Sequence, residues 1–293
     1  MSYAFSTGRE LIALCEKENL TIAEVMIRRE AETSEKTRDE LVNEMFENLL
    51  TMQKSIRFGL EENQQTVTGL AGGNAEKLMA YAEKANMGRD MAQICAAALA
   101  VAEVNASMGR IVAAPTAGAS GVLPAVLVMC SEKHGFTDRD LVNGLFAAGA
   151  VGVIIARNAS ISGAEGGCQA EIGSACSMAS AALAELYGMD TDQIEYAAEV
   201  AMEHHLGLTC DPVMGLVQVP CIERNAVAAM RAINAVSLAN FLTYTRKISF
   251  DLIVETMYQT GKDLSKIYRE TSEGGLAKLY KPAQKNESTE EIK

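Results

Sequence analysis

Three of the seven cysteines in this chain lie in segments rich in glycine or proline. Cys168 follows a pair of glycines, Cys210 precedes an Asp-Pro pair, and Cys221 follows a proline. Glycine lets the backbone approach a ligand closely, and proline fixes the backbone beside it. Since a thiolate is both a nucleophile and a ligand for soft metals, these residues are candidates for chemistry.

The remaining four cysteines have the pattern of core residues. Cys15, Cys95 and Cys130 lie within apolar, helix-compatible segments, where cysteine behaves as a small hydrophobe. Cys176 shares a segment with Cys168, but eight residues of helix would separate the two by ~12 Å along the axis. Thiolates on one compact cluster lie closer together than that, so we assign Cys176 to the core.

The cysteine spacing by itself leaves two interpretations open. There is no Cys-x-x-Cys pair, which disfavours zinc-ribbon and ferredoxin sites. Structural thiols are slightly favoured over ligands on spacing alone. Three thiolate ligands instead of four would leave one iron of a cluster free to bind a substrate, as in catalytic metal sites. Our hypothesis from these residue types is an iron–sulfur cluster used in catalysis.

The composition excludes several classes of protein. The chain has 293 residues and a formal net charge of −12, which argues against a nucleic-acid partner. The first residues lack the basic start and apolar stretch of a signal peptide. The most apolar segment, 141–156, is shorter than the ~20 residues that span a bilayer. We therefore expect a cytoplasmic protein without a membrane partner, whose cysteines are free or bind metal.

Almost every segment has a helical pattern, so the predicted fold class is all-α. We expect a compact bundle of apolar helices and a more exposed N-terminal helical segment. The pattern from Thr21 to about Leu60 fits one long helix or two joined ones. Three irregular loops lie between apolar helices, and such loops on a rigid scaffold are where a site is built. They cover residues 109–121, 158–168 and 209–221. The predicted divisions are 1–60, the N-terminal segment; 61–280, the catalytic domain; and 281–293, a polar tail expected to be disordered.

These loops carry a specific resemblance to a known family. The chain resembles the α subunit of the two-subunit, iron–sulfur-dependent L-serine dehydratase over most of residues 75–245. The resemblance is carried by GRIVAAPTAGASG at 109–121, by GAEGGCQAEIG at 163–173, and by EHHLGLTCDP at 203–212 with PCIERN at 220–225.

The resemblance implies a cofactor and a reaction. The family's [4Fe–4S] cluster is held by three cysteines that match Cys168, Cys210 and Cys221. Its fourth iron binds the carboxylate and hydroxyl of L-serine as a Lewis acid, which makes the hydroxyl a better leaving group. A base removes the Cα proton, water leaves, and the aminoacrylate becomes pyruvate and ammonia. No pyridoxal phosphate is needed.

The chain departs from the family pattern in two respects. Relatives carry a Ser-Ser-His-Thr type motif, in a β subunit or a second domain, that contributes a catalytic histidine. This motif is absent here, where the only histidines are His134, His204 and His205. Activity would then require a β subunit, which the N-terminal helices or the loops could dock. Some single-chain relatives also end in a cysteine that caps the fourth iron, but the last cysteine here is Cys221.

Residues 115–121 precede a predicted helix, where backbone N–H groups can hold a carboxylate. A plain turn and helix cap is the alternative, and the resemblance favours binding. The candidate substrate-binding residues are Thr116, Gly118, Ser120 and Gly121.

Four charged or polar residues near the cysteines have two interpretations each. Glu165 is the candidate catalytic acid or ammonium ligand, or else a structural hydrogen-bonding residue. Glu171 fits a carboxylate that matches the dipole of a first helical turn. His204 would hydrogen-bond near the cluster or end a helix. Arg224 would pair with Glu223, with cluster charge or with substrate.

Two rival functions remain open from the sequence. A related iron–sulfur lyase would act on cysteine or on a hydroxy acid, and the sequence does not measure that preference. A non-catalytic iron–sulfur subunit is the other, although redox clusters usually have four protein ligands.

Overall fold

The computed structural model describes residues 2–62, 64–66 and 68–282. Within these residues the chain forms thirteen α-helices and no strand, and the only β-type pairing is one isolated bridge between Cys210 and Arg269. The all-α prediction is therefore confirmed. The predicted disordered tail, 281–293, lies outside the described residues from 283 onward.

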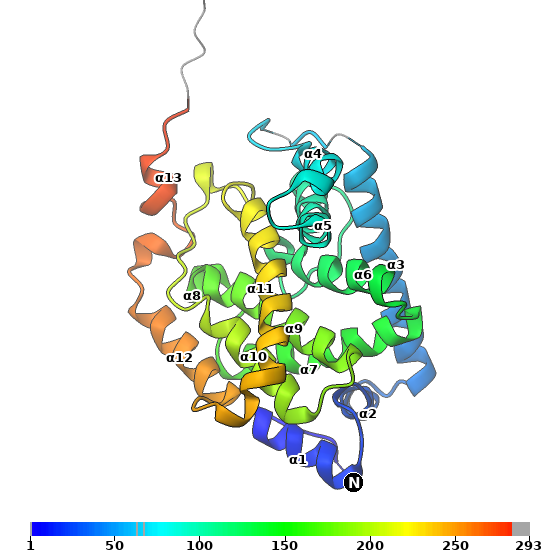
Figure 1. Ribbon diagram of the computed structural model, residues 1–293. Helices are drawn as coiled ribbons and strands as arrows, with labels where there is room; N and C mark the ends of the chain where they lie inside the picture. Colours follow the sequence, from blue (N-terminus) through cyan, green and yellow to red (C-terminus); the bar gives the residue numbers. More distant parts are fainter. Residues whose placement is uncertain (1, 63, 67, 283–293) are drawn as a thin grey trace, which may run out of the picture.

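The helices follow one another along the chain, with long connections before α6 and α11 (Figure 1). Their bounds are α1 Gly8–Glu18, α2 Ile22–Ser34, α3 Arg38–Glu61, α4 Asn74–Tyr81, α5 Arg89–Ala106, α6 Val122–His134, α7 Asp138–Asn158, α8 Gly163–Gly166, α9 Ser174–Leu186, α10 Thr191–Glu203, α11 Cys221–Leu242, α12 Phe250–Asp263 and α13 Gly275–Leu279. A π-helical turn, η3, covers Gln169–Gly173 between α8 and α9.

Helix α9 lies at the centre of the molecule, surrounded by α6, α7, α10 and α11 (Figure 1). Its residues from Ser174 to Ala184 are all buried, and most are alanine or serine. Small side chains let the neighbouring helices approach closely, and a helix that is apolar on all sides belongs in a core. The loop before α9 is therefore attached to the most rigid part of the fold.

The N-terminal segment packs against this core with one face and exposes the other. Helix α2 contacts α7, α3 contacts α5 and α7, and α3 runs along one side of the molecule from α2 to α4 (Figure 1). The helical stretch expected from Thr21 to Leu60 is two helices. The break occurs at Glu35, which has a left-handed backbone (φ 59°), and Thr37 then starts α3 with a complete capping box.

Two helices have the length and hydropathy of membrane spans, namely Asp138–Asn158 and Cys221–Thr245. In the folded chain, 67% and 44% of their apolar windows are buried, respectively. Helix α7 in particular packs against α2, α3 and α9, so its apolar composition is accounted for by the core.

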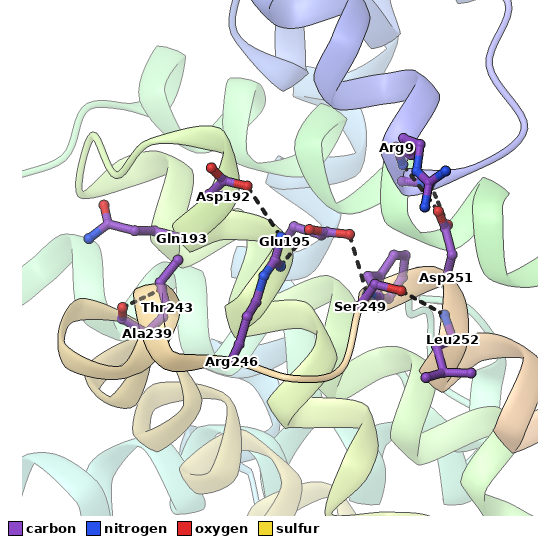
Figure 2. Close-up of polar contacts among 12 residues, drawn as sticks. Arg9, Asp192, Gln193, Glu195, Ala239, Thr243, Arg246, Ser249, Asp251 and Leu252 are labelled. Atoms are coloured by element: carbon purple, nitrogen blue, oxygen red, sulfur yellow. Dashed lines mark hydrogen bonds and ion pairs between the residues drawn. The ribbon is translucent and has the colours of Figure 1, made fainter.

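An ion-pair network joins α10 to the segment between α11 and α12 (Figure 2). The Arg246 guanidinium lies 2.5 Å from the buried Glu195 carboxylate and 3.2 Å from that of Asp192. Nearby, Asp251 at the start of α12 accepts a 2.6 Å hydrogen bond from the backbone N–H of Gly8 at the start of α1. These contacts hold α12 against α1 and α10, and α12 in turn supports the loops described below.

We predict that Arg246→Ala destabilises the protein by ~3 kcal/mol, because the buried Glu195 carboxylate loses its cation. Urea unfolding measures the difference. Lys133→Ala is the matched control, since its ion pair with Asp90 is exposed on both sides and contributes little to stability. An equal loss of unfolding free energy in the two variants would contradict a special contribution of the buried Arg246–Glu195 ion pair.

A buried acid on α10 lies beside this network. The Glu199 side chain is 1% exposed, and burial followed by the nearby Glu203 carboxylate raises its pKa to about 8. Arg246 opposes this shift in the Glu199 pKa, and Glu195 adds to it. Burial, followed by the Glu199 carboxylate, raises the pKa of the neighbouring Tyr196. Folded Glu199 therefore keeps a proton that the unfolded chain releases near its ordinary pKa of 4.5.

This difference makes stability depend on pH with a defined sign. Between about pH 5 and about pH 8 the folded state binds more protons than the unfolded state, so the free energy of unfolding falls as pH rises. We predict that Glu199→Gln flattens this slope, whereas Glu132→Gln, at an exposed position, leaves it unchanged. Chemical unfolding at the two ends of the window tests this, and identical slopes in wild type and Glu199→Gln would refute it.

Candidate active site

The three loops expected to form the site converge beside α9 and α11. The loop at 158–168 carries Cys168, and the loop at 209–221 carries both Cys210 and Cys221. Cys168 lies between α8 and the π-helical turn and is 2% exposed. Cys210 is 3% exposed, and Cys221 is the partly exposed first residue of α11. All seven cysteines are free thiols.

The three thiols lie near enough to one another to interact electrostatically. Burial raises the pKa of Cys168 to about 11 and that of Cys221 to about 12. Burial also raises the pKa of Cys210, and the Cys168 thiol is the next largest cause for both Cys210 and Cys221. Neighbouring thiols removed from water resist ionisation unless a cation joins them, which is the environment of a metal-binding group.

Within residues 2–62, 64–66 and 68–282, no group of three or more His, Cys, Asp or Glu side chains gathers tightly enough to hold a single metal ion. Thiols that hold a polynuclear cluster stand farther apart than those around one ion. The arrangement therefore does not resemble a zinc site.

Cys176 lies elsewhere, in the core between α9 and α11. It is fully buried, and its thiol donates a 3.2 Å hydrogen bond to the backbone oxygen of Ala228. This is the core position expected for it.

A buried glutamine joins two of the cysteine loops. Gln169 is 0% exposed, and its Nε2 donates to the backbone oxygens of Gly166 (2.8 Å) and Met257 (2.9 Å). Its Oε1 accepts the backbone N–H of Gly207 at 2.9 Å. The turn around Cys168, the segment leading to Cys210 and helix α12 are thereby fixed together.

A buried asparagine joins the loop at 109–121 to the start of α11. Asn225 is 0% exposed, and its Nδ2 donates to the backbone oxygens of Gly118 and Cys221, both at 2.8 Å. Its Oδ1 accepts the N–H of Gly121 at 2.9 Å. A Cβ at Gly121 would lie 2.4 Å from the backbone oxygen of Ala98, so only glycine permits this approach.

The C-terminal segment holds Cys210 from the other side, where the loop before α11 runs beside α13 (Figure 1). The Cys210 N–H donates to the oxygen of Tyr268, and its oxygen accepts from the N–H of Glu270, both at 2.8 Å. Asp211 accepts a 2.7 Å hydrogen bond from the N–H of Leu276. Both sides of the Cys210 backbone are therefore paired.

Arg224, predicted to act near the cysteines, lies among them. It donates to the backbone oxygen of Thr209 at 2.7 Å and pairs with the buried Asp211 at 3.3 Å. Its charge also opposes the rise in the pKa of Cys168 that burial causes. The ion pair with Glu223 considered from sequence is replaced by the one with Asp211.

The predicted substrate loop divides into two halves. Thr116 and Gly118 face the interior between the loops, where the Thr116 hydroxyl donates to Glu171 at 3.0 Å. Ser120 is fully buried, and its hydroxyl has no hydrogen-bond partner within the described part of the chain. Gly121 packs behind the loop. A binding role for these four residues stays a prediction.

Two other predicted residues make contacts within their own segments. Glu165 is exposed and accepts a 2.5 Å hydrogen bond from the hydroxyl of Ser160. His204 is exposed at the end of α10, with its Nδ1 2.8 Å from the backbone oxygen of Val200. These contacts match the structural alternatives considered for both residues, and their proposed roles at the site stay predictions.

Glu171 is the residue whose place the sequence did not indicate. Its Oε1 accepts from Thr116, and its Oε2 lies 3.9 Å from the sulfur of Cys210. A Cβ at Gly163 would lie 2.6 Å from Oε2, so glycine there leaves room for the carboxylate. Glu171 thus contacts all three loops, and burial raises its pKa. Its position three residues after Cys168 was the available signal.

We predict that Gln169→Leu loosens the site, because the N–H of Gly207 and two backbone oxygens lose a buried partner. The expected cost is ~2–4 kcal/mol in unfolding free energy, together with faster reaction of the site thiols with a thiol reagent. Gln259→Leu, at an exposed position of α12, is the control. Unchanged thiol reactivity in Gln169→Leu would contradict the role of Gln169 in holding the two segments and α12 together.

Known proteins resemble this chain over nearly its whole length. The family described as serine dehydratase alpha chain matches residues 17–277. The probable L-serine dehydratase alpha chain of Bacillus subtilis is 42% identical over 93% of this chain and 91% of that protein. The L-serine dehydratase of Streptomyces coelicolor and L-serine dehydratase 1 of Escherichia coli are each 44% identical over 94% of this chain.

The relatives from Streptomyces coelicolor and Escherichia coli are longer than this protein. The chain spans 61% of the Streptomyces protein and 62% of the Escherichia coli protein. The family model nonetheless covers all three loops and the three cysteines. The chain belongs to the serine dehydratase alpha chain family.

Proposed function

We propose that this chain is the catalytic α chain of an L-serine dehydratase, which converts L-serine to pyruvate and ammonia. We further propose that Cys168, Cys210 and Cys221 hold a [4Fe–4S] cluster, without pyridoxal phosphate. The observation that carries the proposal is the convergence of three free thiols, two buried and one partly exposed, from two of the loops. The family match and the names of the relatives support the reaction.

The donor set fits a cluster with one open iron. Soft thiolates suit iron–sulfur clusters, and three of them leave one position for a substrate. A Cβ at Gly163 would lie 3.0 Å from the sulfur of Cys210, so glycine keeps space beside that ligand. When bound, such a cluster supplies a Lewis acid that makes the serine hydroxyl a better leaving group.

The chain's own residues orient the substrate and exclude water. In residues 116–121 the N–H groups of Ala119, Ser120 and Gly121 already donate within the protein. We therefore assign carboxylate binding to the first half of the loop, at Thr116 and Gly118. Arg224 contributes positive charge beside the thiolates, which favours their ionised form.

The base that removes the Cα proton is proposed to come from a β chain. The three histidines have other contacts: His134 stacks edge-on against Tyr187, and the rings of His204 and His205 lie against backbone oxygens of α10. Burial lowers the pKa of His205 to about 4. The relative from Bacillus subtilis is named an alpha chain, which supports a partner. We place the enzyme in the cytoplasm, where its thiols stay reduced.

Anaerobic reconstitution with iron and sulfide tests the cluster. We expect about four irons per chain, lost on replacing Cys168, Cys210 or Cys221 by alanine. Cys176→Ala is the matched control and retains them. Iron content that does not fall in the Cys210→Ala and Cys221→Ala variants would overturn the ligand assignment.

Activity separates the rival functions. With the β chain present and air excluded, we expect faster ammonia release from L-serine than from L-threonine or L-cysteine. A reconstituted complex that holds iron but releases no ammonia would indicate a non-catalytic iron–sulfur subunit.

A further inference from the structure

The Glu171 carboxylate lies at the point where the three loops meet. Thr116 donates to its Oε1 at 3.0 Å, and the sulfur of Cys210 lies 3.9 Å from its Oε2. Gly163 keeps the space beside Oε2 free, since a Cβ there would lie 2.6 Å from that oxygen. The carboxylate is therefore within the site rather than on the helix surface.

This carboxylate has no cationic partner within the described part of the chain. None of the ion pairs there involves Glu171. The guanidinium of Arg224 is engaged by Thr209 and Asp211. The other charged group that acts on Glu171 is the carboxylate of Glu270, which has the same sign. A largely buried carboxylate without a cation is unfavourable, so a cationic ligand group would stabilise it.

An α-amino acid offers one such group. Its carboxylate would be repelled by a second carboxylate, and its hydroxyl could donate a hydrogen bond but carries no charge. Its ammonium group supplies the missing positive charge and can donate directly to Oε2. Oε1 is already used by the Thr116 hydroxyl, which fixes the orientation of the carboxylate. A charge-assisted hydrogen bond of this kind is roughly twice as strong as a neutral one.

We propose that Glu171 binds the α-ammonium group of the substrate and makes the site selective for amino acids over the corresponding hydroxy and unsubstituted acids. This inference rests on the proposed function, because it assumes that L-serine enters between the three loops. A ligand that lacks the ammonium group would leave the carboxylate unpaired. Sites built to pair a polar group reject analogues without it for this reason.

The test compares L-serine with 3-hydroxypropionate, which has the serine skeleton without the amino group. In the reconstituted complex, Glu171→Gln should raise the KM for L-serine by about 10- to 100-fold. The inhibition constant of 3-hydroxypropionate should change by no more than about twofold or should improve, because that ligand makes no ion pair with Glu171. Glu223→Gln, at an exposed position beside Cys221, should leave both constants unchanged.

Two results would overturn the proposal: an unchanged KM for L-serine, or equal weakening of both ligands, which would indicate a merely structural role. Iron content is measured in each variant so that cluster loss is recognised. If Glu171→Gln does not fold or bind iron, Glu171→Asp keeps the charge and should still prefer L-serine to 3-hydroxypropionate. An Asp variant without that preference contradicts the assignment.

The proposed function is checked separately in the wild-type complex. If this complex releases no ammonia, calorimetric binding of the same two compounds still tests Glu171. Tight binding of L-serine alone, lost in Glu171→Gln, supports the ammonium site even if the lyase assignment fails. Equal binding of the two compounds to the wild type overturns the ammonium site at Glu171.

Discussion

The site depends on two amide side chains that satisfy buried polar backbone groups in three loops. A loop that leaves the surface carries N–H and C=O groups that need partners, and in an all-α protein no sheet supplies them. Gln169 and Asn225, both 0% exposed, use their amide oxygens and nitrogens to bridge different loops. An amide suits this task because it donates and accepts at once.

The alanine-rich core makes this arrangement possible. Helices α5, α9 and α11 pack closely through small side chains, so the ends from which the loops emerge are fixed relative to one another. Glycines then allow the close approaches that a Cβ would prevent, at Gly121 against Ala98 and at Gly163 beside Glu171. The C-terminal segment adds backbone pairing to Cys210, and the ion pairs of Arg246 hold α12 in place beneath it.

Sequence reasoning predicted the parts of this structure that depend on local pattern. Helical periodicity and the scarcity of strand signals predicted the all-α fold, and the motifs around the cysteines predicted the family; both predictions are confirmed. The break at Glu35 was left open because helix-forming residues continue across it, and the capping box of Thr37 decided it. The ligand and substrate roles of the site residues stay predictions.

The sequence pattern did not predict how residues distant in the chain pack against one another. A loop position three residues before Cys168 suggested a catalytic role for Glu165, but its side chain is exposed. Glu171 was expected on a regular first helical turn. It lies instead in a π-helical turn, where the wider helix changes which face each side chain occupies, and such turns often occur at functional sites. Neither effect leaves a periodic signal in the sequence.

The most direct test of the account is a crystal structure of the anaerobically reconstituted protein, with iron located by anomalous scattering. We expect four irons between the loops, three of them bonded to the sulfurs of Cys168, Cys210 and Cys221, and none at Cys176. Iron bonded to other cysteines, or a fully iron-loaded protein with these three sulfurs unbonded, would contradict it.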